Sequence, residues 1–252
     1  MPEPLLRVAS LSKRFGGLQA LNDVTFEVEP GQIYAVIGPN GAGKTTLYNI
    51  VTGFLPPSAG TVHFLGHDVT SAAVHERVRL GMARTFQNIR LFKDLSVLEN
   101  VLVGQHTRLS SRGASPFPLR PQTDRRLRQD AMALLERVGV AAYATRTAGE
   151  LAYGLQKRIE LARALAGQPK MLLLDEPRAG LNRQETDAMA RELCALRDEG
   201  MTILLVEHDM RMVMNISDRI CVLNFGARIA QGVPTEIQSN AAVIEAYLGR
   251  DE

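Results

Sequence analysis

The chain has 252 residues, of which 45% are hydrophobic and 22% are charged, and its formal net charge is +2. These values are those of an ordinary globular protein with a buried core, and they exclude disorder, collagen and coiled coil as descriptions of the whole chain. A charge so close to balance does not by itself argue for nucleic-acid binding.

Cysteine usage and apolar runs indicate the compartment. The two cysteines, Cys194 and Cys221, have no CxxC spacing, so neither a disulfide scaffold nor a zinc ribbon is expected. No segment approaches the roughly 18 to 20 apolar residues of a membrane helix. The first ten residues lack the pattern of a signal peptide. We expect a cytoplasmic protein that reaches a membrane only by docking to a protein that spans it.

The first sixty or so residues predict mainly strands. Apolar residues alternate with polar ones over 24–28 and again over 60–65, the period of a half-buried strand. The apolar run 32–37 suits a strand covered on both faces. A Gly-rich turn then leads into a predicted helix, in which four apolar residues recur at helical spacing: Leu47, Ile50, Val51 and Phe54.

The middle of the chain, about 88–165, has helical character. Residues 110–123 carry three prolines and little periodicity, which predicts an exposed loop. One helical stripe follows, with Thr123 as a candidate cap at its start and Gly139 at its end. The stripe consists of Leu127, Ala131, Leu134 and Val138.

The last third alternates between strands and helices. The pattern predicts strands at 170–175, 201–207 and 219–224, helices at 183–199 and 209–216, and a hairpin around Gly226. Such alternation implies βαβ units and a parallel sheet. We therefore expect an α/β core interrupted by a helical subdomain, with early antiparallel strands on one side.

Residues 38–45 read GPNGAGKT, a phosphate-binding loop between a predicted strand and a predicted helix. The glycines let backbone N–H groups approach phosphates, Lys44 brings positive charge to the β and γ phosphates, and the Thr45 hydroxyl suits Mg²⁺. The alternative is an ordinary Gly-rich turn, which the strand and helix on either side disfavour. The expected nucleotide contacts here are Gly38, Pro39, Asn40, Gly41, Ala42, Gly43, Lys44, Thr45 and Thr46.

Two carboxylates end the apolar strand MLLLDE at 171–176. In a parallel sheet, strand ends of this kind border the ligand site. We expect Asp175 to hold Mg²⁺ and Glu176 to orient and deprotonate the attacking water. A plain surface turn is the alternative. His208 follows the next apolar strand and is expected to contact the γ-phosphate, although a histidine at a strand end is often only solvated or a cap.

With these motifs the chain resembles the ATP-binding subunit of an ABC transporter, over nearly its whole length. The resemblance lies in the phosphate loop 38–45, in LAYGLQ at 151–156 where the family has its LSGGQ signature, and in LLLDEP at 172–177. It implies one ABC ATP-binding domain over 1–252, of P-loop NTPase fold with a mixed or parallel sheet, an antiparallel β subdomain and a helical insertion at about 88–165.

The resemblance also implies roles for further residues. Gln87 matches the glutamine that touches Mg²⁺ and contacts the membrane subunit, and Phe15 matches the aromatic residue that stacks on adenine. Gly154 is the signature glycine, and His208 matches the histidine that completes the site.

Two residues have simpler alternative explanations. Phe15 could be a core residue, although Lys13 to Gly17 looks like an exposed turn. Asn182 stands where the family usually has Asp, but Asn182 with Glu185 also matches a helix capping box.

Several segments are similar to the branched-chain amino acid importers: SKRFGGLQALNDV near the start, LAYG, AGLN and VIEAYLG. Two residues depart from the signature of the wider ABC family: Ala152 replaces the serine, as the branched-chain group often does, and Leu155 replaces the glutamine, which is less usual. Arg178 stands where the branched-chain group more often has a small residue. By the resemblance, these changes affect the contacts that this chain would make with the ATP bound to a partner subunit.

We therefore predict an ATPase that binds ATP and Mg²⁺ and powers uptake of a small solute at the cytoplasmic face of the membrane. The implied partners are transmembrane permeases, a second ATPase in a head-to-tail dimer and, indirectly, an extracytoplasmic solute-binding protein. Lipopolysaccharide export, a soluble ABC ATPase of translation or DNA repair, and a regulatory nucleotide binder remain alternatives. A P-loop GTPase is disfavoured because no NKxD motif occurs.

Overall fold

The computed structural model describes residues 3–106 and 121–248. They form two compact units, which are described separately. The first unit comprises Met1–Arg77, Leu174–Glu176 and Leu193–Glu252, and the second comprises Val78–Leu173 and Pro177–Glu192. The single domain with an insertion at about 88–165 stays a prediction.

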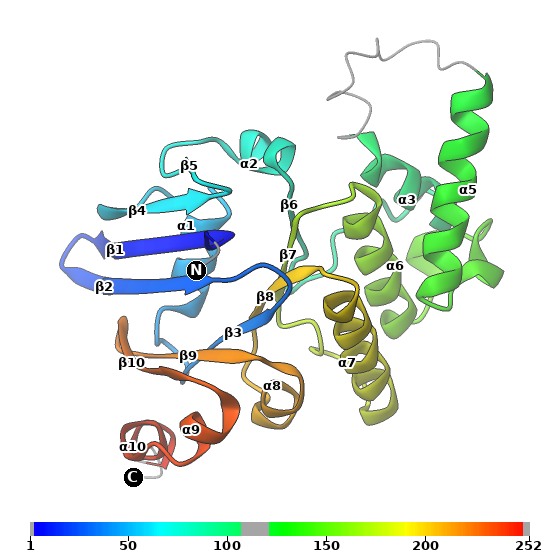
Figure 1. Cartoon of the computed structure of the whole chain (residues 1–252). Coiled ribbons are helices and arrows are strands. Elements are labelled where there is room, and N and C mark those ends of the chain that lie inside the picture. The colour runs from blue at the N-terminus through cyan, green and yellow to red at the C-terminus, as the bar shows by residue number, and fades with distance from the viewer. Residues whose placement is uncertain (1–2, 107–120, 249–252) are drawn as a thin grey trace. The chain divides into compact units, whose positions relative to one another are not determined.

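The first unit contains an antiparallel sheet in the order β2-β1-β4-β5 (Figure 1). Its strands are β1 (Leu6–Phe15), β2 (Leu18–Val28), β4 (Ala59–Phe64) and β5 (His67–Asp68). Leu6 lies opposite Val28 and Val8 opposite Phe26, and these alternate residues are buried. The predicted turn at Lys13 to Gly17 is too long, because Lys13 to Phe15 still belong to β1.

A second sheet of the first unit is parallel at its centre. β3 (Ile33–Ile37) lies between β8 (Thr202–Val206) and β9 (Arg219–Asn224), parallel to both. Every residue of β3 and β8 is buried, which explains their continuous apolar sequences. β10 (Ala227–Gly232) pairs antiparallel with β9, which confirms the hairpin around Gly226.

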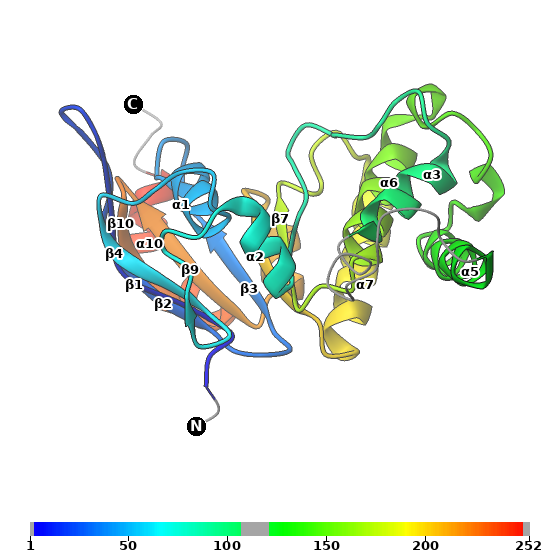
Figure 2. The ribbon, with the colours of Figure 1, turned by 90° about the horizontal axis from the view of Figure 1, so that it is seen from above.

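The helices that accompany these sheets in the described residues are α1 (Lys44–Val51), α2 (Val74–Leu80, which continues into the second unit), the last part of α7 (Arg183–Asp198), α8 (Met210–Ile216), α9 (Pro234–Gln238) and α10 (Ala241–Leu248). Figures 1 and 2 both show α10 beside β10. The prediction that Phe54 continues α1 is wrong. Gly53 has φ +83° and ends the helix, with Phe54 N–H bonded to Asn49 O at 2.8 Å and the Phe54 side chain 52% exposed.

The second unit is mainly helical. It contains α3 (Val97–Gly104), α5 (Pro121–Arg137), α6 (Tyr153–Ala166), the first part of α7 (Arg183–Asp198), and two 3₁₀ turns at Ala141–Tyr143 and Ala148–Glu150. β6 (Met82–Arg84) pairs in parallel with residues 171–173 of β7 (Met171–Asp175). The sequence analysis did not identify α2, β6, α9 or α10.

Helix α5 corrects one prediction and confirms another. It begins at Pro121, so residues 121–123 are helical rather than part of a loop, and Thr123 is not its cap. Pro is well suited to a first helical turn, where its missing N–H has no partner to lose. The rest of the predicted loop lies outside the described residues. The helix ends at Arg137, and Gly139 just beyond it has the left-handed conformation of a C-terminal cap, as predicted, with φ +71° and Val140 N–H bonded to Leu135 O at 2.8 Å.

Candidate functional site

The phosphate loop connects β3 to α1 in the first unit. Gly38 and Gly43 have positive φ angles of +152° and +102°. A Cβ atom at Gly38 would collide with Leu223 O, and one at Gly43 would lie 2.6 Å from Ala20 O. Only glycine fits at these two positions, since neighbouring backbone occupies the space of any side chain. The packing of the surrounding backbone therefore requires glycine at these two positions of the loop.

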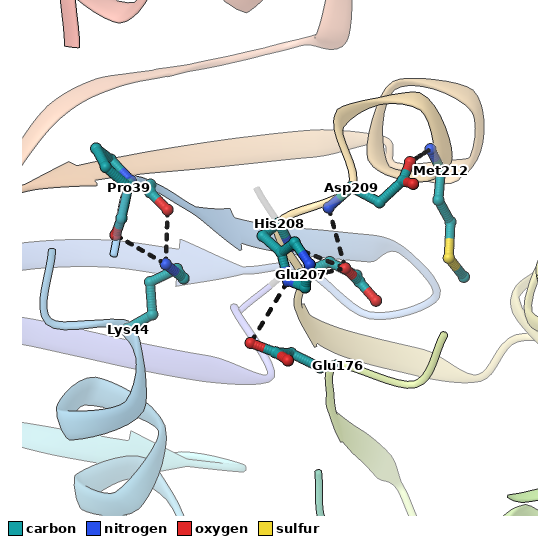
Figure 3. Close-up of polar contacts among 8 residues, drawn as sticks. Pro39, Lys44, Glu176, Glu207, His208, Asp209 and Met212 are labelled. Carbon is teal, nitrogen blue, oxygen red and sulfur yellow. Dashed lines mark hydrogen bonds and ion pairs between the residues drawn. The ribbon is translucent and has the colours of Figure 1, made fainter. Parts of the chain in front are cut away.

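Lys44 is buried under this loop. Its Nζ donates hydrogen bonds to Gly38 O at 2.6 Å and Pro39 O at 3.0 Å (Figure 3), and the side chain is only 8% exposed. No side chain caps the N-terminus of α1 at Gly43. The first N–H groups of α1 and the Lys44 ammonium thus provide positive potential on one loop, the arrangement that binds phosphate.

A cleft of about 390 Å³ opens beside the loop, within the size range of small-molecule sites. Its lining includes the loop residues from Asn40 to Thr46 and Glu176. It also includes three exposed apolar residues, Phe15, Leu18 and Phe225, which are 46%, 67% and 77% exposed. Gln19 and Ala20 complete the lining. The cleft therefore combines a cationic phosphate loop with exposed apolar side chains, the two kinds of surface that suit the phosphates and the base of a nucleotide.

The two acids lie at the end of β7: Asp175 is its last residue, and Glu176 follows it. Asp175 is buried, with 7% of its surface exposed. Glu176 has φ +47°, and its N–H bonds to Val206 O at 2.8 Å. A positive φ is uncommon for a residue other than glycine, and such conformations cluster at functional sites. The turn places Glu176 in the lining of the cleft.

His208 lies beside Glu176. Its Nδ1 is 3.5 Å from Glu176 Oε1 and 3.7 Å from Glu207 Oε2, and its side chain is 48% exposed (Figure 3). Glu207 is completely buried and accepts N–H bonds from His208 at 2.8 Å and Asp209 at 3.1 Å. Asp209 in turn caps α8 through Met212 N–H. Glu207, which the sequence analysis missed, thus holds the turn that presents His208.

The C-terminal helix α10 reaches the start of the loop. Burial raises the pKa of the Tyr247 phenol to about 12, and an interaction with the Gly38 backbone opposes this rise. The phenol is therefore neutral at physiological pH.

Gln87 belongs to the second unit, just after β6. Lys157 of α6 donates from Nζ to Gln87 O at 3.0 Å and to Phe86 O at 3.3 Å. Glu160, one turn further along α6, accepts the Arg90 N–H at 3.2 Å. Burial raises the pKa of this carboxyl, and the Arg90 N–H and the Lys157 charge oppose the rise. Helix α6 therefore holds the backbone of residues 86–90.

The signature segment forms the start of the same helix. Ala152 is the N-cap of α6 and provides no side-chain hydrogen bond. Glu185 presses against Gly154, where a Cβ atom would collide with Glu185 Oε1. The capping box is confirmed, since Asn182 N–H bonds to Glu185 Oε2 at 2.9 Å and Glu185 N–H to Asn182 Oδ1 at 3.0 Å. Glu185 therefore joins the start of α7 to the signature glycine.

The donor set fits magnesium bound together with a phosphate. Among the described residues, no group of three or more His, Cys, Asp or Glu side chains is placed to hold a metal ion. Mg²⁺ is usually held by one or two protein oxygens plus substrate phosphates and water. The Thr45 hydroxyl and the Asp175 carboxylate would be these protein oxygens.

These elements define the class: a P-loop NTPase with an α/β core. The chain belongs to the ABC transporter ATP-binding family, because the family model described as "ABC transporter" matches residues 21–179. A second model, described as "Branched-chain amino acid ATP-binding cassette transporter", matches residues 227–252.

Individual relatives cover the whole chain. It is 46% identical over 253 residues to the high-affinity branched-chain amino acid transport ATP-binding protein BraF of Pseudomonas aeruginosa, with 99% of each chain covered. It is equally similar over 254 residues to LivG of Escherichia coli K12, again with 99% of each covered. An ATP-binding cassette of an ABC transporter, solved in its ADP conformation, matches with a TM-score of 0.86, 33% identity and coverage of 99% and 100%.

In the parts of the chain that the structure describes, no helix has the length and apolar character needed to cross a membrane.

Proposed function

We propose that this chain is the ATP-hydrolysing subunit of an importer for branched-chain or related amino acids. The observation that supports it most directly is the cleft in which the phosphate loop and Glu176 meet, with His208 Nδ1 at 3.5 Å from the Glu176 carboxylate. The match of residues 227–252 to the branched-chain amino acid group favours this solute class over lipopolysaccharide export.

Each residue has a part in the proposed reaction. Lys44 and the N–H groups of the loop bind the phosphates and neutralise charge that develops on the γ-phosphate. Glu176 accepts a proton from the attacking water, and His208 orients the Glu176 carboxylate and contacts the γ-phosphate. A bound Mg²⁺, held by Thr45 and Asp175, would supply further charge neutralisation. Phe15 stacks on the adenine.

Membership of the family supports the following assembly. Two ATPase subunits close head to tail, so that Gly154 of one chain faces the nucleotide of the other. The chain acts at the cytoplasmic face of the membrane, attached to two permeases that receive solute from an extracytoplasmic binding protein.

Reconstitution tests the proposal. The chain is co-expressed with permeases, a second ATPase and a solute-binding protein from the same genome, and the complex is placed in proteoliposomes containing MgATP. We expect ATP-dependent uptake of labelled leucine that Glu176→Gln abolishes. Uptake of no branched-chain amino acid by an ATP-hydrolysing complex would contradict the solute assignment, and copurification without any membrane protein would contradict transport.

A further inference from the structure

The tip of the β9–β10 hairpin carries an exposed aromatic residue in an unfavourable backbone conformation. Phe225 and Gly226 have φ angles of +45° and +78°, so both central residues of the turn are left-handed. Two-residue turns of this kind favour Asn, Asp or Gly at the first position, because a bulky side chain is strained there. Phe225 is nevertheless 77% exposed, so burial in the core does not explain it.

Hydrogen bonds fix this tip beside the phosphate loop. Gly226 N–H bonds to Ala42 O at 3.0 Å, and Asn22 N–H bonds to Gly226 O at 2.8 Å. The turn is thus tied both to the loop and to β2. Phe225 lines the same cleft as Phe15 and the loop residues. The place of Phe225 in the lining is therefore set by a backbone hydrogen bond to the phosphate loop itself.

A second hairpin turn of the first unit provides the comparison. Leu65 and Gly66, between β4 and β5, have φ angles of +53° and +74°, the same conformation with another bulky residue in first place. Leu65 N–H bonds to Leu5 O at 2.9 Å, and Leu65 is not among the residues lining the nucleotide cleft. The conformation alone therefore indicates nothing about function, and only the placement of Phe225 does.

We propose that Phe225 is a second aromatic contact for the nucleotide base, in addition to Phe15. The inference rests on the proposed binding of ATP in this cleft. The phosphates bind at Lys44 and Thr45, and the base lies against the exposed apolar residues of the same lining, among them Phe15 and Phe225. An exposed phenyl ring in this lining contacts the π-face of a purine and removes apolar surface from water. Phe225 is thus a determinant of affinity for the base and not for the phosphates.

Two matched variants and two probes test this. Phe225→Asn and Leu65→Asn each place a turn-favoured residue at the same backbone conformation, so both variants should fold, with thermal stability equal to or above that of the wild type. Affinities for MgATP and for inorganic triphosphate are measured by calorimetry. We expect Phe225→Asn to weaken MgATP binding by about 3- to 10-fold, the range of one aromatic stacking contact, and to leave triphosphate binding unchanged. Leu65→Asn should change neither affinity.

The outcomes are separable. Wild-type MgATP affinity in Phe225→Asn overturns the proposal, and so does an equal loss for MgATP and triphosphate, which would place the effect on the loop. A wild-type protein that binds neither probe would instead refute the proposed nucleotide site.

Fluorescence gives an independent measurement. The chain contains no tryptophan, so Phe225→Trp introduces a single reporter and Leu65→Trp its control. We expect MgATP to change the emission of Phe225→Trp, triphosphate to change it much less, and the control to respond to neither. Emission from Phe225→Trp that MgATP leaves unchanged at saturation overturns the contact.

Discussion

The phosphate loop of the first unit and the signature segment of the second unit differ in how completely they match their family. In the loop, Lys44 is held by two carbonyl groups, and glycines occupy the positions where a side chain would collide. In the signature segment, Ala152 provides no side-chain hydrogen bond, and Leu155 stands in place of an amide side chain. The groups that would serve this chain's own ATP are intact, whereas those it would offer to a partner's ATP are reduced.

This difference suggests an asymmetric pair of ATPases. A missing hydrogen bond to a charged group is worth roughly 1.5–3 kcal/mol, which is about tenfold to a hundredfold in rate if the bond acts only in the transition state. We hypothesise that this chain works best opposite a different ATPase whose intact signature completes the site at Lys44. The site built on this chain's Gly154 should then be the slower one.

The largest expected effect on ATP binding and turnover comes from a substitution in the phosphate loop, the region that matches its family fully. Lys44→Ala removes the buried ammonium and should weaken ATP binding and abolish turnover, because no other side chain of the loop brings positive charge to the phosphates. Nucleotide affinity and phosphate release are measured, with thermal unfolding as a control for the lost bonds to Gly38 and Pro39. Turnover at the wild-type rate would refute the assignment of the site.

Glu176→Gln should have the next largest effect. The amide keeps the size of the side chain, so MgATP should still bind, but it cannot accept a proton from water. We expect hydrolysis at least ~100-fold slower, within the range for a general base. Single-turnover phosphate release measures the chemical step directly. A rate near that of the wild type would remove Glu176 from the role of base.

The asymmetry itself predicts a smaller difference. In a reconstituted complex with a second ATPase, the base glutamate is replaced in one subunit at a time. Loss of Glu176 should reduce ATPase activity more than loss of the partner's glutamate, by up to the tenfold to hundredfold estimated above. Equal losses, or full transport by a complex containing only this ATPase, would contradict the asymmetric hypothesis and leave the family assignment intact.

Ala152→Ser is a companion variant for that experiment. Because Ala152 is the N-cap of α6, a serine there should stabilise the helix whether or not its hydroxyl reaches a phosphate. Thermal unfolding reports the cap, and activity at the partner's nucleotide site reports the phosphate contact. A gain in stability without a gain in rate would mean that the lost hydroxyl was only a cap.

The local sequence pattern was sufficient to locate the polar residues at and just after the ends of the buried strands. A buried strand has few reasons to end in charge, so Asp175, Glu176 and His208 could be predicted one segment at a time. Glu207 could not be predicted in this way, because its carboxylate accepts hydrogen bonds from backbone groups of its own turn and gives no periodic signal in the sequence.

Phe225 was also missed, because its exposure and its φ angle depend on a hairpin that is hydrogen-bonded to β2 and to the phosphate loop. The end of α1 was misjudged because apolar spacing continued past Gly53, whose left-handed conformation stops the helix.

Asn182 provides the smallest and last test of the comparison, because it lies beside the signature segment through Glu185. Its side chain accepts Glu185 N–H at 3.0 Å, so it is a structural cap of α7 whatever else it does. Asn182→Ala should lower the free energy of unfolding by about 0.5–2 kcal/mol, whereas Asn182→Asp keeps a capping carboxylate and introduces the residue usual in the family. If Asn182 is only a cap, Asn182→Asp should match the wild type in both stability and ATPase activity.

If Asn182 also acts at the interface between subunits, Asn182→Asp should alter ATPase activity while thermal unfolding stays unchanged. Denaturant unfolding of the isolated chain and ATPase activity of the assembled complex, measured on both variants, separate the two roles, since a lost cap changes both quantities and a lost interface contact changes only the second.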